Sequence, residues 1–184
     1  MPAGCASGTT RAGSTLAILS DAWLTIASRI SAAGPFGSVT TDTDNRAHLE
    51  TTLKVVSSFE LPTIWFWPNP DAGTGEMADS LRHMRESRPE LTAHMRFITN
   101  VPADDFVALL AHASCLIGNS SAGIKECSFL GTPVVNIGAR QQGRLTAEHV
   151  THVGHDATEI GAAIAMQLAH GRYTPSHIYY RNNA

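Results

Sequence analysis

Two adjacent serines, Ser120 and Ser121, mark the stretch whose residue types most favour binding chemistry. They follow an apolar run that begins at Cys115 and precede a helical pattern that begins at Ala122. A strand that runs into a helix leaves backbone N–H groups and the positive end of the helix dipole to hold an anion, and the hydroxyls add donors. A diphosphate is the natural ligand of such a site. The same residue types also cap helices that bind nothing, and this stretch alone favours the two interpretations about equally.

Two arginines in the next loop favour the anion site. A second apolar run, 132–138, ends in a loop that carries Arg140 and Arg144. A guanidinium group is a planar pair of donors that suits phosphate oxygens, so two of them facing the serines would hold a diphosphate from both sides. Glu126, one turn into the helix after the serines, is placed to accept both hydroxyls of a ribose. An ordinary solvated helix glutamate is the alternative for that residue.

Common nucleotide and hydrolase motifs are incomplete in this chain. G-x-G-x-x-G and G-x-x-x-x-G-K-[ST] are absent, which removes the main support for an NAD-binding site or a P-loop. Residues 119–123 nearly match the nucleophile elbow G-x-S-x-G around Ser121, but Asn119 stands where the first glycine belongs. A serine hydrolase that uses Ser121 therefore remains a weaker alternative.

His149, His152 and His155 recur at every third position, a spacing that suggests metal ligands. The β-branched residues between them predict a strand, in which side chains three apart point to opposite faces. We therefore expect packing or surface histidines and no metal site.

The composition excludes several function classes. Of 184 residues, 43% are apolar and only 16% are charged, with a formal net charge of −3. No basic excess is present to attract nucleic acid, and no apolar run is long enough to cross a membrane. Cys5, Cys115 and Cys127 are odd in number and widely spaced, so we expect reduced thiols in a cytoplasmic protein without a leader sequence.

Short apolar runs alternate with helical segments from about residue 36 onward. We predict strands at 36–41, 63–67, 95–98, 115–117, 133–137 and 150–153, and helices at 44–59, 77–88, 104–113, from 122, and at 156–170. This alternation predicts a Rossmann-like α/β domain, a parallel sheet with helices on both faces, with ligand at the carboxyl ends of the strands. Residues 14–33 resemble an amphipathic helix that supplies no strand. We therefore divide the chain into an unassigned segment, 1–35, and a Rossmann-like domain, 36–184.

Four stretches resemble the C-terminal half of UDP-N-acetylglucosamine 2-epimerases, in order and at similar spacing over about 39–180. They are Pro68-Asn-Pro-Asp-Ala-Gly73, Asn100-Val-Pro-Ala-Asp-Asp-Phe106, Ile117-Gly-Asn-Ser-Ser-Ala-Gly-Ile-Lys-Glu126 and Gly131-Thr-Pro-Val-Val-Asn-Ile-Gly-Ala-Arg-Gln-Gln-Gly-Arg144. The likeness is greatest to the hydrolysing branch, which includes the epimerase part of the bifunctional animal enzyme of sialic acid synthesis. The non-hydrolysing branch usually carries Thr-Glu-Arg-Pro-Glu where this chain has residues 139–144.

The resemblance implies the C-terminal domain of a two-domain, GT-B-like fold that binds a UDP-sugar in the cleft between Rossmann-like domains. The positions that match the family's UDP-binding residues are Asn69, Val101, Ser120, Ser121, Glu126 and Arg140, with Arg144 as an additional phosphate contact. The implied reaction eliminates UDP across C1 and C2 of UDP-N-acetylglucosamine and hydrates the resulting glycal to N-acetylmannosamine. The resemblance implies no cofactor and no metal.

Departures from the family pattern bear on activity. The family's proton-handling carboxylates belong to an N-terminal domain that residues 1–35 do not supply, and Gly37 stands where the family has a functional histidine. We therefore expect a fragment that is inactive alone and binds UDP or UDP-N-acetylglucosamine, with a homo-oligomer or a separately encoded N-terminal domain as its partner. A noncatalytic nucleotide-sugar-binding module or partner subunit is the alternative. Asp79 and Arg82 occupy the helix on which the animal enzymes bind a feedback nucleotide-sugar, and feedback by that route is not expected.

Overall fold

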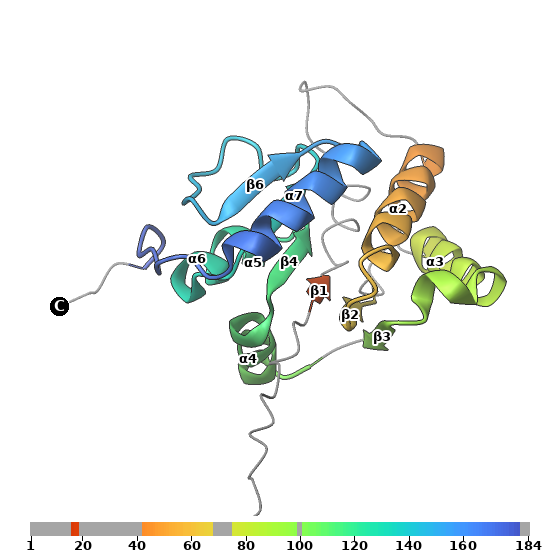
Figure 1. The fold of residues 1–184 in the computed structure, drawn as a ribbon, viewed down its shortest axis with the longest axis horizontal. Helices are drawn as coiled ribbons and strands as arrows, with labels where there is room; N and C mark the ends of the chain where they lie inside the picture. Colours follow the sequence, from red (N-terminus) through yellow and green to blue (C-terminus); the bar gives the residue numbers. More distant parts are fainter. Residues whose placement is uncertain (1–15, 19–41, 68–74, 99–100, 181–184) are drawn as a thin grey trace, which may run out of the picture.

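Six strands within the described part of the chain, residues 16–18, 42–67, 75–98 and 101–180, form a parallel sheet (Figure 1). The strands are β1 (Leu16–Ile18), β2 (Thr63–Phe66), β3 (Met95–Ile98), β4 (Cys115–Gly118), β5 (Val134–Ile137) and β6 (Val150–Val153). Their order across the sheet is β3-β2-β1-β4-β5-β6, and every neighbouring pair is parallel. The expected parallel, Rossmann-like sheet is confirmed. The strand expected at 36–41 lies outside the described residues.

Helices connect most of these strands. They are α2 (Asp42–Ser57), α3 (Gly75–Ser87), α4 (Ala103–His112), α5 (Ser121–Ile124), α6 (Glu126–Leu130) and α7 (Ala157–His170), with a short 3-10 helix at Pro89–Thr92. Asp156 caps α7, because its carboxylate accepts hydrogen bonds from the N–H groups of Thr158 at 2.8 Å and Glu159 at 3.0 Å. No helix in the described ranges combines the length and apolarity that a membrane crossing requires.

Residues 16–18 correct one expectation, since they form a strand rather than part of a helix over 14–33. Leu16–Ile18 pairs with β2 on one side and β4 on the other, at the centre of the sheet. Three residues carry little local signal, and it is the backbone hydrogen bonds to both neighbours that hold them extended. The domain division at residue 36 stays a prediction, although β1 shares the sheet with the later strands.

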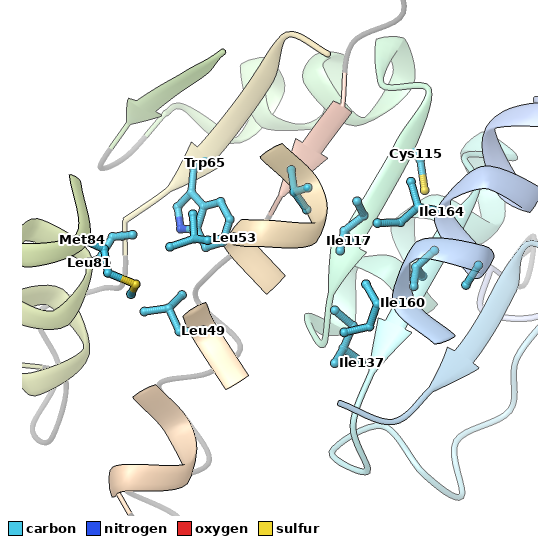
Figure 2. Packing of buried hydrophobic residues seen from close by; sticks show 13 residues of the cluster. Leu49, Leu53, Trp65, Leu81, Met84, Cys115, Ile117, Ile137, Ile160 and Ile164 are labelled. Atoms are coloured by element: carbon cyan, nitrogen blue, oxygen red, sulfur yellow. The ribbon is translucent and has the colours of Figure 1, made fainter. Parts of the chain in front are cut away.

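Two apolar cores cover the two faces of the sheet. Successive strand residues point to opposite faces, so Ile117 joins one core and Leu116 the other. Figure 2 shows the first core, in which side chains of α2 and α3 lie beside Trp65 of β2, and Ile160 and Ile164 of α7 lie beside strands β4 and β5. The second core receives side chains from α4, α5 and α6. Leu49, Leu53 and Val56 of α2 are buried in the first core.

The strand order reverses between β1 and β4. From β1 the sheet continues through β2 and β3 on one side, and from β4 it continues through β5 and β6 on the other. In open parallel sheets, ligands bind outside the carboxyl ends of the strands at such a reversal, because the flanking connections diverge there. β4 ends at Gly118, so the serines that follow lie at this point of the sheet.

Candidate functional site

The serine loop, residues 119–121, connects β4 to α5. Gly118 precedes it with a φ of 136°, a conformation that L side chains rarely adopt. Ser120 is the N-cap residue of α5, and its Oγ accepts a hydrogen bond of 3.2 Å from the N–H of Ala122. A hydroxyl that accepts through a lone pair keeps its own proton for donation to an anion. Capping and anion binding are therefore compatible at Ser120.

Ser121 is the first residue of α5 and is partly exposed. Within the described ranges its side chain makes no hydrogen bond, to a histidine or to any other group. A serine nucleophile needs an adjacent base to take its proton. The geometry therefore gives the serine hydrolase interpretation no support, and it leaves the hydroxyl available to a ligand.

The helix expected from Ala122 onward is divided in two, which corrects the sequence interpretation. α5 ends at Ile124, and α6 begins at Glu126 after Lys125. α6 packs against α4. Four residues align few peptide dipoles, so individual N–H groups and hydroxyls, rather than a long-helix dipole, must hold an anion here. Glu126 is the first residue of α6, not a residue one turn into a continuous helix.

The arginine loop, residues 139–144, follows β5. Two turns shape it, with hydrogen bonds from the N–H of Gln142 to the carbonyl of Ala139 at 2.9 Å and from the N–H of Arg144 to the carbonyl of Gln141 at 3.2 Å. Arg140 is partly exposed and Arg144 is exposed, whereas Gln141 between them is only 1% exposed. The loop therefore leaves both arginines at least partly exposed and buries the Gln141 side chain.

The serine loop and the arginine loop are in direct contact. Nε2 of Gln141 donates a hydrogen bond of 2.7 Å to the backbone carbonyl of Asn119, in a fully buried position. β4 and β5 pair directly below the two loops. The structure thus brings Ser120 and Arg140 into adjoining loops beyond the carboxyl ends of β4 and β5. That these side chains bind UDP stays a prediction.

The other expected nucleotide-binding positions are distributed along the chain. Val101 immediately precedes Pro102, the N-cap of α4, and packs against the core on the α4 side of the sheet. Glu126 is partly exposed at the start of α6. Asn69 and Gly37 lie outside the described residues.

The three regularly spaced histidines contact three different partners. The buried His149 lies 2.8 Å, at Nε2, from a backbone carbonyl of α5, and burial lowers its pKa. Nδ1 of His152 lies 3.0 Å from Nδ2 of Asn136. His155 stacks on His48 with ring centroids 3.5 Å apart, and burial, followed by the charge of His48, lowers the pKa of His155 to about 4. The predicted strand is confirmed, and no three potential metal ligands converge within the described ranges.

Neither described cysteine is a candidate nucleophile. Cys115 and Cys127 are buried free thiols. Burial raises the pKa of Cys115 to about 12, and burial also raises the pKa of Cys127, with the nearby Glu126 adding to the effect. Only the thiolate is reactive, so both side chains serve as core residues.

Sequence reasoning missed the two residues that join the loops. Gln141 stands in a run of polar residues that is typical of an exposed loop, and the residue type of Asn119 suggests a helix cap or a departure from the nucleophile elbow, not a buried contact. Both residues are 1% exposed. No local signal distinguishes Gln141 from Gln142, which is exposed.

Known proteins are similar to this chain over the part that contains both loops. A family model described as UDP-N-acetylglucosamine 2-epimerase matches residues 38–184. A UDP-N-acetylglucosamine 2-epimerase of Neisseria meningitidis serogroup B is 30% identical over 110 residues, which are 60% of this chain and 28% of that protein. A hydrolysing UDP-N,N'-diacetylbacillosamine 2-epimerase of Legionella pneumophila is 28% identical over 133 residues, which are 70% of this chain and 33% of the relative.

A solved structure shares the fold. The crystal structure of the UDP-GlcNAc 2-epimerase of Methanocaldococcus jannaschii, in complex with UDP-GlcNAc and UDP, superposes with a TM-score of 0.59 at 12% sequence identity. The superposition covers 89% of this chain and 41% of the other. The chain therefore spans less than half of the length of the relatives that it matches.

Proposed function

The chain belongs to the UDP-N-acetylglucosamine 2-epimerase family, and from this premise we propose that it is the UDP-binding C-terminal domain of a hydrolysing member. The observation that carries the proposal is the contact between the serine loop and the arginine loop at the point where the strand order reverses. Hydroxyl donors and guanidinium groups on two adjoining loops suit a diphosphate. The Legionella relative, named as hydrolysing, supports the choice of branch.

Each residue has a distinct part in this proposal. Ser120 and Ser121 donate to phosphate oxygens, and Arg140 with Arg144 balances the charge of the diphosphate. Glu126 accepts hydrogen bonds from the ribose hydroxyls. Val101 and Asn69 are assigned to UDP by the family resemblance alone.

The proposed reaction needs groups beyond this domain. A base removes the proton on C2 of the sugar, the C1–O bond breaks with its electron pair going to UDP, and water adds to the glycal to give N-acetylmannosamine. This chain holds the leaving group, whose negative charge grows as the C1–O bond breaks, so its cations lower the barrier of that step. The proton-handling carboxylates come from an N-terminal domain, and we propose that the chain alone has no epimerase activity.

A noncatalytic nucleotide-sugar-binding subunit is the second candidate. Gly37, in place of the family's functional histidine, favours it. Assay of the chain mixed with a separately expressed epimerase N-terminal domain distinguishes the two candidates. Release of N-acetylmannosamine by the mixture supports the epimerase, and UDP binding without release supports the noncatalytic subunit.

The test of UDP binding is calorimetry on the full chain. UDP is expected to bind, and Arg140→Ala is expected to weaken binding by about 1.5–3 kcal/mol, the contribution of a hydrogen bond to a charged group. Arg96→Ala, on the exposed surface of the edge strand β3, is the matched control and should leave the affinity unchanged. Absence of UDP binding would refute the proposal, and equal affinity of Arg140→Ala and the parent chain would refute the role of that arginine.

The proposal also places the protein in the cytoplasm. Cys115 and Cys127 remain free thiols in the structure, which is usual in a reducing compartment.

A further inference from the structure

The buried side chain of Gln141 connects the two loops that carry the candidate phosphate ligands. We propose that Gln141 is a positioning residue, which holds the serine loop and the arginine loop at the separation that a diphosphate requires. This inference rests on the proposed function. Gln141 itself does not touch the nucleotide; it acts through the residues beside it.

The position of the hydrogen bond supports this role. Its acceptor, the carbonyl of Asn119, belongs to the peptide unit whose N–H is that of Ser120. Its donor belongs to the residue directly after Arg140. The bond of 2.7 Å lies beyond the last paired residues of β4 and β5, where the sheet no longer sets the distance between the chains. Loss of the bond would therefore move a serine and an arginine relative to each other.

The buried polar atoms of Gln141 and Asn119 argue against a purely structural role for Gln141. Oε1 of Gln141 is buried without a hydrogen-bond partner, and so are both polar atoms of the Asn119 side chain. Buried polar atoms without partners destabilise a fold, by more than one ordinary hydrogen bond stabilises it. A methionine, which has nearly the same shape, would fill this site without that cost. Fold stability alone does not account for an amide at position 141, whereas the connection between the loops does.

The experiment compares Gln141→Met with Gln142→Met. The control removes the same side-chain type one residue away, at an exposed position. UDP affinity and melting temperature are measured for both variants, in the parent chain and in an Arg140→Ala background. Gln141→Met is expected to weaken UDP binding about three- to tenfold, the fold-change of one ordinary hydrogen bond, without lowering the melting temperature. In the Arg140→Ala background the loss should shrink, because one of the two groups that Gln141 positions is then absent.

Two results would overturn the inference. One is an unchanged UDP affinity in Gln141→Met. The other is a loss of the same size in both backgrounds accompanied by a lower melting temperature, which indicates a general structural role.

A measurement without UDP tests the role of Gln141 independently of the proposed function. If the parent chain binds no UDP, the proposed function fails, and hydrogen exchange of the Ala122 amide in the ligand-free chain decides the positioning role. That amide is bonded to Ser120 Oγ, so a loosened serine loop exposes it. Faster exchange in Gln141→Met than in Gln142→Met supports positioning, and equal exchange contradicts it.

Discussion

Gly131, at the end of α6, offers a test of how closely the backbone before β5 packs against the backbone of Tyr173. It ends α6 with φ of 66° and ψ of 20°, and its carbonyl accepts a hydrogen bond of 2.9 Å from the N–H of Tyr173. A Cβ at this position would lie 2.1 Å from the backbone carbonyl oxygen of Tyr173. Real Cβ atoms essentially never come within 3.0 Å of another heavy atom outside the neighbouring residues, so Gly131→Ala must displace backbone.

The expected cost has separable parts. Left-handed backbone destabilises an alanine by roughly 1–2 kcal/mol. The lower conformational entropy of the unfolded alanine variant offsets about 0.4–1 kcal/mol of this loss. Overpacking adds about 1–3 kcal/mol, and loss of the hydrogen bond to Tyr173 adds about 0.5–1.5 kcal/mol. Gly131→Ala should therefore lower the free energy of unfolding by about 1.5–6 kcal/mol.

Gly143→Ala is the matched control for backbone strain. Gly143 also has a positive φ, 81°, but nothing lies within 4 Å of its added Cβ. Its substitution should cost only the strain, about 0–1.5 kcal/mol after the change in the unfolded chain. Urea unfolding of both variants and the parent measures the difference. If the two alanines destabilise equally, the contact with Tyr173 does not matter and the reasoning fails.

Three further predictions concern a cap, a titration and two thiols. Asp156→Ala should destabilise the protein by about 1 kcal/mol in urea unfolding, because two N–H groups of α7 lose their acceptor; an unchanged midpoint would exclude this cap as a source of stability. His155 takes up its proton near pH 4 when folded and near pH 6.5 when unfolded, so its contribution to stability should fall as the pH falls from 6.5 to 4. His155→Gln should reduce that slope in pH-dependent melting, and a slope equal to that of the parent chain would contradict the assignment. Cys115 and Cys127 should resist alkylation by iodoacetamide until urea unfolds the chain, as peptide mass mapping can measure; rapid labelling of the native protein would contradict their burial.

Local pattern was sufficient to predict most of the elements. Strands β2 to β6 and helices α2, α3, α4 and α7 begin and end within two residues of the predicted bounds. Their signals are short apolar runs and helical periodicity, which depend on residues close together in the chain. Strand β5 and the loop with Arg140 that follows it could therefore be placed from the sequence alone.

The exceptions have non-local causes. β1 is held by hydrogen bonds to strands whose partner residues lie far along the chain. The division between α5 and α6 accompanies packing of α6 on α4, and no residue type near Lys125 predicts this division. Burial of Gln141 depends on a contact 22 residues away, at Asn119.

The sequence by itself determined the order of the elements, the family and the identity of the candidate ligands Ser120, Ser121 and Arg140, because motifs and periodicity are properties of neighbouring residues. Only the tertiary structure decided the strand order that reverses between β1 and β4, and the buried hydrogen bond through which the two loops meet. It also decided that Gln141, and not Gln142, turns inward to join them. The physical reason is that sheet pairing and burial are set by residues distant in the chain, and a local pattern cannot report on partners that it does not contain.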